Sequence, residues 1–174
     1  LMKLENEYDL VISSSAGFGK GIGASQWSIV NSQKLSRHIA YIHTPLRYAW
    51  EIDYLKLRNY LITRYKVSKI LFFGSTSNDP ERILLHENLQ RMGCQVLLVP
   101  TKRFADGKLK ADVDSRMTFE MMRLEKEYDQ TVVITGDGDF FWVLEYLLAI
   151  KEKVLLFGFA RRTARDLKRL FGEN

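Results

Sequence analysis

Two aspartates stand one glycine apart in the stretch TVVITGDGDFFWVLEYLL, residues 131–148. Asp137 and Asp139 follow an apolar, strand-like run and precede an apolar, helix-like run, and Gly138 between them permits a sharp turn. Carboxylates held this close raise each other's pKa unless a cation neutralises them. Hard divalent cations such as Mg²⁺ or Mn²⁺ prefer oxygen ligands. The pair therefore predicts a metal-binding or catalytic turn, with helix capping by Asp139 as the alternative.

A second acidic group lies in KADVDSRMTFE, residues 110–120. Asp114 falls in the first turn of an expected helix, and Glu120 lies further along that helix. Acidic residues are common at helix starts because the macrodipole favours them, so each of these alone is a weak signal. Two acidic clusters at two strand-to-helix edges are a stronger one. We predict that Asp114, Asp137 and Asp139 hold the metal ion, and we add Glu120 to the catalytic candidates.

Basic residues flank both acidic groups, and the net charge of the chain is +5. An acidic metal centre with a basic rim suits phosphodiester chemistry, because the metal activates water while the rim holds the polyanion. The C-terminal run also fits a merely solvated helix. The basic residues predicted to contact the phosphates of such a polyanion are Lys102, Arg103, Lys108, Lys110, Arg161, Arg162 and Arg165.

Hydroxyl and aromatic side chains complete the candidate site. We expect Thr135, Ser13 and Thr163 to place hydroxyl groups near it. The aromatic run at 140–142 either stacks on bases or packs in the core around a helix start, and core packing is the commoner use of such a run.

The remaining sequence alternates between apolar strands and helices of about three turns, which indicates a parallel sheet covered on both faces. The fold class is therefore α/β: a Rossmann-like, three-layer fold with a mainly parallel central sheet. The carboxyl ends of all its strands should share one edge, where ligands bind. We expect strands at 9–13, 38–42, 68–75, 94–100, 131–136 and 153–159, and helices at 53–65, 80–93, 112–127, 138–152 and 162–171.

Length and composition limit the classes of protein to which the chain can belong. The 174 residues suit one domain, with an atypical segment at about 1–50, and the single Cys94 excludes an internal disulfide framework and a Cys-rich zinc site. No apolar run approaches the roughly 18 residues of a bilayer span. We expect a cytoplasmic protein without membrane contact, and a homo-oligomer or a protein partner stays open.

From about residue 53 to 171 the chain resembles an NYN domain of the LabA-like type, within the PIN-like nuclease superfamily. The resemblance rests on YLKLRNYLITRYKVSKILFFGS, LQRMGCQVLLVPTKRFADGKLKADVD, YDQTVVITGDGDF and KVLLFGFARRTARDLKRL. It implies a Rossmann-like sheet, an acidic cluster that binds Mg²⁺ or Mn²⁺, and hydrolysis of RNA. Asp114 matches the acid of the family's Lys-x-x-Val-Asp block, and Asp137 and Asp139 match its acidic pair. Glu120 stands where the family often has a second Asp.

One departure concerns the strand that opens such domains, which ordinarily ends in a block like Phe-Ile-Asp-x-x-Asn and supplies a principal metal ligand. The strand expected at 9–13 instead ends in VISSS, with Ser13 or Ser14 in the place of that acid. A hydroxyl there predicts weaker metal binding. Residues of about 8–50, through YDLVISSS and HIAYIHTPLRYAWE, resemble a segment of Rossmann-type nucleotide-sugar glycosyltransferases.

Three functional hypotheses follow. The first is a divalent-metal-dependent ribonuclease of the NYN type. The second is a catalytically impaired NYN-type module that binds RNA or regulates, which the missing first acid favours. The third is a fragment of a nucleotide-sugar glycosyltransferase, which the HTPLRYAWE run favours.

Overall fold

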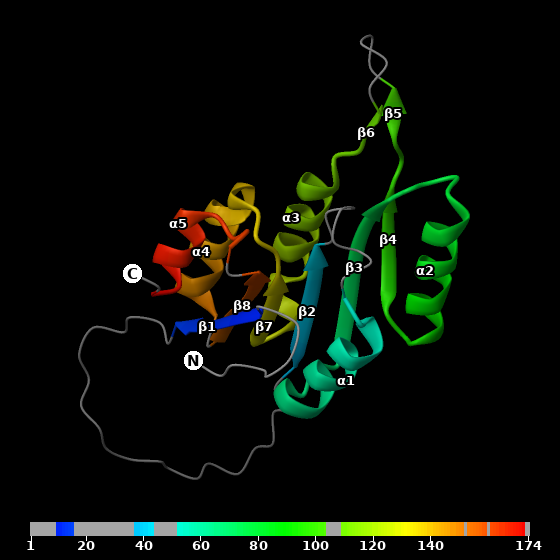
Figure 1. Cartoon of the computed structure of the whole chain (residues 1–174). Helices are drawn as coiled ribbons and strands as arrows, with labels where there is room; N and C mark the ends of the chain where they lie inside the picture. The colour runs from blue at the N-terminus through cyan, green and yellow to red at the C-terminus, as the bar shows by residue number, and fades with distance from the viewer. Residues whose placement is uncertain are drawn as a thin grey trace, which may run out of the picture.

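A computed structural model of the chain describes residues 10–15, 37–43, 52–103, 109–151, 153–159 and 161–172 (Figure 1). Within this part of the chain the strands are β1 (Leu10–Ser15), β2 (His38–His43), β3 (Lys69–Ser75), β4 (Gln95–Val99), β5 (Lys102–Arg103), β6 (Leu109–Lys110), β7 (Gln130–Ile134) and β8 (Lys153–Phe159). The α-helices are α1 (Tyr54–Tyr65), α2 (Pro80–Arg91), α3 (Val113–Arg123), α4 (Phe141–Ile150) and α5 (Arg165–Leu170). Short 3₁₀ turns lie at Glu125–Glu127 and Gly138–Phe140.

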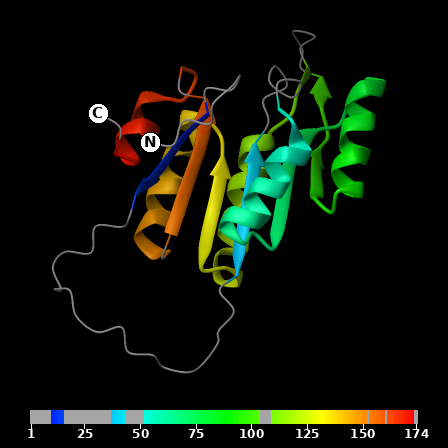
Figure 2. The same cartoon turned by 60° about the horizontal axis from the view of Figure 1, so that its bottom comes forward.

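The main sheet has the strand order β1-β8-β7-β2-β3-β4. The five strands from β8 to β4 run parallel to one another, as the arrows in Figure 2 show. Helices α1 and α2 pack on one face of the sheet, and α3, α4 and α5 pack on the other. The predicted α/β, Rossmann-like, three-layer fold is confirmed.

Strand β1 departs from the prediction that all strands end at one edge. It pairs antiparallel with β8 at the border of the sheet, so that Leu10 lies opposite Phe159 and Ser15 lies opposite Val154. Its carboxyl end therefore lies at the edge where the parallel strands begin. Alternation of strands and helices predicts parallel neighbours, but an added border strand needs no crossover helix and can run in either direction.

Both faces of the sheet are buried, which explains the continuous apolar runs in its strands. In β2, Ile39 and Tyr41 belong to the core beneath α3 and α4, whereas Ala40 and Ile42 belong to the core beneath α1 and α2. All four side chains are at most 3% exposed. Burial of this kind is the main favourable term in folding, and it fixes the end of β2 firmly in place.

The order of the strands creates a switch point beside β2. The chain runs outward from β2 through β3 to β4, and then crosses to β7 and β8 on the other side of β2. Crossovers on opposite faces leave a crevice at the carboxyl ends of the two strands where the direction reverses, and ligands bind there in open α/β sheets. Here those two strands are β2 and β7.

A small ribbon connects β4 to α3. The polar segment expected at 101–110 contributes β5 and β6, which pair antiparallel and stand out from the sheet (Figure 1). The ribbon returns the chain to the carboxyl edge of the sheet, so that α3 begins there. In the described residues, no helix combines the length and apolar character that a membrane crossing requires.

Candidate metal centre

His43 is the last residue of β2, and its side chain is 8% exposed. Its Nε2 atom lies 2.9 Å from Asp114 Oδ1, and its Nδ1 atom lies 3.2 Å from Thr135 Oγ1. The ring of Phe140 packs edge-on against the imidazole, with 5.1 Å between the ring centroids. Both ring nitrogens and the ring itself are therefore held by neighbours, and the imidazole has a fixed orientation.

Asp114 reaches the site because α3 begins beside the end of β2. Asp112 caps that helix, with its Oδ1 accepting a hydrogen bond of 3.3 Å from the Ser115 backbone N–H. Asp114 then lies in the first turn, where the helix dipole favours a carboxylate. The hydrogen bond from His43 lowers the pKa of the Asp114 carboxyl below its usual value, although burial acts to raise it. Electrostatic attraction to His43 and Lys110 lowers this pKa further.

Asp137 occupies the turn that follows β7. Its backbone N–H donates to Thr135 Oγ1 at 3.1 Å, and its Oδ1 accepts from the Asp139 backbone N–H at 3.1 Å. The capping role considered for Asp139 thus belongs to Asp137. Gly138 permits close packing, because a Cβ atom at that position would lie 3.2 Å from Ala164 Cβ. This turn is therefore held both by its own hydrogen bonds and by the segment that leads into α5.

The hydrogen bonds around His43 follow one order. The Thr135 oxygen accepts from the Asp137 N–H, and its single O–H can then donate to His43 Nδ1. In the neutral imidazole the proton consequently lies on Nε2, which donates to Asp114. Four residues, from the end of β2, the turn after β7 and the start of α3, are thereby linked without an unpaired donor.

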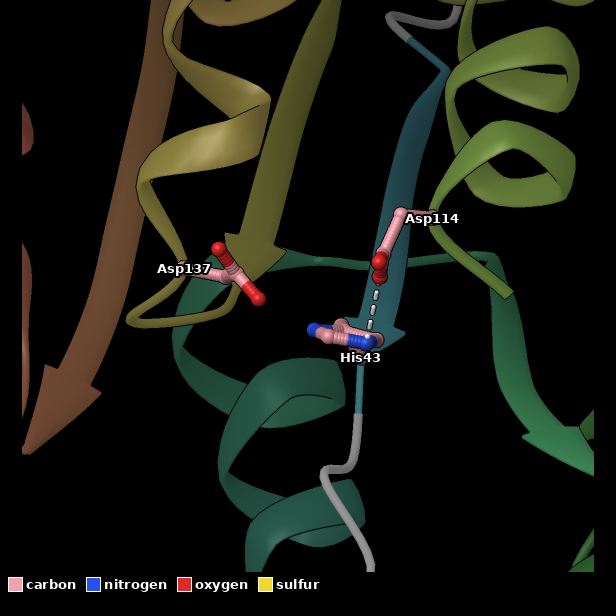
Figure 3. Close-up of side chains that lie close together, drawn as sticks. All are labelled: His43, Asp114 and Asp137. Carbon is pink, nitrogen blue, oxygen red and sulfur yellow. Dashed lines mark ion pairs between the residues drawn. The ribbon is translucent and has the colours of Figure 1, made fainter. Parts of the chain in front are cut away.

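Ligand atoms of His43, Asp114 and Asp137 all lie within 4.8 Å of one another. Figure 3 shows the side chains converging from the end of β2, the start of α3 and the turn after β7. One imidazole nitrogen and two carboxylate oxygens suit Mn²⁺ and its neighbours among the divalent transition metals. Two carboxylates also balance the charge of one divalent ion. The donor set therefore fits a divalent cation, and binding by this group stays a prediction.

Two predicted acidic residues stand apart from this group. Asp139 is exposed, and among the described residues the group of ligand atoms within 4.8 Å includes Asp137 but not Asp139. Glu120 is buried, and its carboxylate makes ion pairs of 2.7 Å with Arg116 and 2.6 Å with Arg123. Glu120 lies on the same helix as Asp114, but its carboxylate is already neutralised there.

The predicted basic residues fall into two sets. The first set lies on the ribbon between β4 and α3, and the second lies on and after the turn that follows β8. A hydrogen bond of 2.9 Å from the Ala164 N–H to the Gly136 carbonyl joins this second turn to the Asp137 turn. Lys108 lies outside the described residues. The exposed basic side chains are Lys102, Arg103, Lys110, Arg161, Arg162 and Arg165.

The three predicted hydroxyl groups have different surroundings. Thr135 is buried within the site and bonds to His43 and Asp137, as described above. Ser13 lies in β1, where its backbone pairs with Leu156 in the middle of β8, and β8 and β7 separate it from β2. The Thr163 hydroxyl donates to the Phe159 carbonyl at 2.9 Å, which stabilises the turn after β8.

His43 is not among the metal ligands predicted from sequence, although it begins the HTPLRYAWE run of the glycosyltransferase hypothesis. The first ligand is expected there at the end of the strand at 9–13, but β1 is antiparallel and the position belongs to the end of β2. A signal was present, since HIAYIH is an apolar strand that ends in a polar residue with a metal-binding side chain. Ser13 and Ser14 therefore do not supply the missing ligand position.

A sequence model of the family described as NYN domain matches residues 38–171. The match begins with β2, ahead of the start near residue 53 that the sequence suggested. The fold resembles the crystal structure of a protein of unknown function from Vibrio parahaemolyticus, with a TM-score of 0.61 and 23% identity over 81% of this chain and 93% of that chain. That likeness concerns the fold alone. No curated protein matches the chain.

Proposed function

We propose that this chain, which belongs to the NYN domain family of PIN-like nucleases, is a divalent-metal-dependent ribonuclease. The observation that carries the proposal is the convergence of His43, Asp114 and Asp137, whose ligand atoms lie within 4.8 Å of one another at the switch point of the sheet. RNA is the expected partner of a domain of this family. The LabA-like subtype and the glycosyltransferase resemblance stay predictions from sequence.

Each group of residues at the site would have its own role in RNA cleavage. A bound divalent ion would supply Lewis acidity toward a phosphodiester oxygen and would make water more acidic. Asp114 and Asp137 would hold that ion by charge, and Thr135 would orient His43 toward it. The exposed basic side chains on the ribbon and after β8 would hold the RNA backbone by charge.

His43 bears on the choice of ion. It ends the first strand of the matched domain, in Tyr41-Ile42-His43, where related domains are expected to end in Phe-Ile-Asp. A neutral nitrogen ligand in place of a carboxylate favours Mn²⁺ over Mg²⁺, because Mg²⁺ strongly prefers oxygen ligands. We therefore assign Mn²⁺ as the better activator.

Cleavage of a labelled single-stranded RNA with Mn²⁺ tests the proposal. We expect the unaltered chain to cleave, Asp137→Asn to lose cleavage, and Asp139→Asn to retain it. The two variants make the same change in the same turn, but only Asp137 belongs to the ligand group. Equal activity of the three proteins, or none with either ion, would contradict the assignment.

A second candidate is an RNA-binding module without hydrolysis. It is favoured by the contact between His43 and Asp114, which neutral histidine and carboxylate can make with no ion between them. A module of this kind would bind RNA with strong salt dependence and would cleave it at no concentration of Mn²⁺ or Mg²⁺. Calorimetric titration with Mn²⁺ separates the two candidates before any RNA is added.

A further inference from the structure

Trp142 is the exposed member of an aromatic triplet that directly follows the candidate metal turn. Phe140 is fully buried beneath His43, whereas 75% of Trp142 is exposed. The ring of Phe141 meets the indole edge-on, with 5.2 Å between the centroids, and so supports it from one side. An indole in the first turn of a helix, held from one side and open to solvent, is ready to receive another flat group.

An open hollow lies beside this indole. It is lined by Gly138, Phe141, Trp142, Asp166, Arg169 and Leu170. Gly138 follows Asp137 directly, so the hollow adjoins the turn that supplies a candidate metal ligand. The 3₁₀ turn at Gly138–Phe140 packs against α5, which contributes the opposite wall.

The lining favours a flat, uncharged group over a phosphate. Aromatic and aliphatic side chains supply most of the walls. Arg169 Nη1 lies 3.8 Å from Asp166 Oδ1, so the cation at the rim is already accompanied by a carboxylate that would repel an anion. A guanidinium can nevertheless stack on an aromatic or heteroaromatic ring. A nucleobase has the flat face and the neutrality that such a hollow accepts.

We infer that Trp142 is a stacking platform for a nucleobase of single-stranded RNA, next to the phosphate held at the candidate metal centre. This inference rests on the proposed function. A protein surface is the competing use, since Tyr146 and Ile150 lie on the same helix and are 45% and 43% exposed. Neither residue lines the hollow, and the hollow joins Trp142 to the metal turn, so the base is favoured.

RNA binding is measured in the full chain carrying Asp137→Asn, so that the RNA stays intact. Fluorescence anisotropy of a short, end-labelled single-stranded RNA compares three further changes: Trp142→Ala, Trp142→Phe and Tyr146→Ala. We expect Trp142→Ala to weaken binding roughly 5- to 150-fold, which is the range of base stacking on aromatic side chains. Trp142→Phe should retain much of the affinity, and Tyr146→Ala should match the parent.

Intrinsic fluorescence supplies a second readout. Stacking should quench Trp142, one of three tryptophans in the chain, and Trp142→Phe should lose that quenching although it still binds RNA. Equal affinity of Trp142→Ala and its parent overturns the inference, as does the absence of any RNA binding. Loss of self-association in Trp142→Ala, with unchanged RNA affinity, assigns the surface to a second copy instead and also overturns it.

The failure of this inference differs from the failure of the proposed function. If Trp142→Ala binds RNA normally while the unaltered chain binds Mn²⁺ and cleaves, then only the stacking platform is wrong. If the unaltered chain neither binds Mn²⁺ nor cleaves, but Trp142→Ala still loses RNA affinity, then only the hydrolytic assignment is wrong.

Discussion

His43 Nε2 lies 2.9 Å from Asp114 Oδ1, and this contact ties the end of β2 to the first turn of α3. The other ring nitrogen meets Thr135 beside the end of β7. An ion that takes Nε2 as its ligand must replace the Nε2 proton, which then belongs on Nδ1. The hydrogen bond to Thr135 reverses its direction as a result. A hydroxyl can serve in both directions because it both donates and accepts.

Replacing His43 with aspartate should change the preference of the site for its ion. Three carboxylates would repel one another without a cation, and their oxygens suit Mg²⁺. We expect the thermal stability of His43→Asp to rise steeply with Mg²⁺, whereas the unaltered chain should respond to Mn²⁺ more than to Mg²⁺. Thermal unfolding with each ion measures this. His86→Asp makes the same change in α2 and should leave the stabilisation by each ion unchanged. If Mn²⁺ still stabilises His43→Asp more than Mg²⁺ does, the prediction is wrong.

Replacing Thr135 with valine should lower Mn²⁺ affinity about 10- to 100-fold, the usual effect of removing a group that orients a metal ligand. Valine preserves the shape but cannot bond to His43 Nδ1 or accept from the Asp137 N–H. Calorimetric titration measures the affinity. Thr163→Val is the matched control, because its hydroxyl bonds to the Phe159 carbonyl, so it should affect stability and leave ion affinity alone. Equal losses of affinity in the two variants would show that the effect is not specific to the site.

Sequence patterns predicted the layers and most of the elements because burial on both faces leaves long apolar runs. The start of α3 at residue 113 and the strand at 130–134 are near their expected bounds. The direction of β1 could not be predicted in the same way, because apolar content is the same for a parallel and an antiparallel border strand. From sequence, the strand at 9–13 is therefore expected to open the domain, and the missing ligand is expected at Ser13 or Ser14 rather than at the end of β2.

Parts of the site followed from sequence, and others needed the packing. Asp114 and Asp137 were predicted from their places at strand-to-helix edges, and the structure brings them to one switch point. The difference between Asp137 and Asp139 needed coordinates, since the turn directs one carboxylate into the capping bond and leaves the other exposed. The role of Glu120 also required coordinates, because sequence spacing alone cannot show that Arg116 and Arg123 form ion pairs with its buried carboxylate.

Replacing Glu120 with glutamine should destabilise the fold without affecting the ion. The change weakens two ion pairs at a buried position, and hydrogen bonds to charged groups contribute about 1.5–3 kcal/mol each before screening. Because both arginines are about half exposed, we expect a loss of about 1–2 kcal/mol in the free energy of unfolding. Urea unfolding measures it. Glu127→Gln, whose exposed carboxylate makes a 3.9 Å pair with Lys69, should change little, and a loss of Mn²⁺ affinity in Glu120→Gln would instead connect Glu120 with the metal centre.

Replacing Gly158 with alanine should disturb the join between β8 and the site. A Cβ atom there would lie 2.4 Å from Thr163 Oγ1 and 2.9 Å from the Thr135 carbonyl oxygen. Overpacking of this kind typically costs about 1–3 kcal/mol of stability. Because Thr135 would move, Mn²⁺ affinity should fall as well. Gly74→Ala is the control, since a Cβ atom there would lie no closer than 3.4 Å to its nearest neighbour, a Phe72 ring carbon. A similar loss of Mn²⁺ affinity in both variants would show that the effect does not depend on the site.

The thiol of Cys94 should react slowly in the folded protein. Burial raises the pKa of this thiol, and Arg58 opposes the rise only in part. The thiolate is the reactive form, so alkylation by iodoacetamide at pH 8 should be slow when the chain is folded and fast in denaturant. The pKa of this thiol is therefore higher in the folded chain than in the unfolded chain, where it is about 8.5. The contribution of the neutral thiol to stability is complete below the pKa of the unfolded state, and it is lost as the pH rises through the pKa of the folded state. The stability difference between the unaltered chain and Cys94→Ala should therefore shrink above that pH, and rapid alkylation of the folded chain would show that Cys94 is not held in the core beneath α1 and α2.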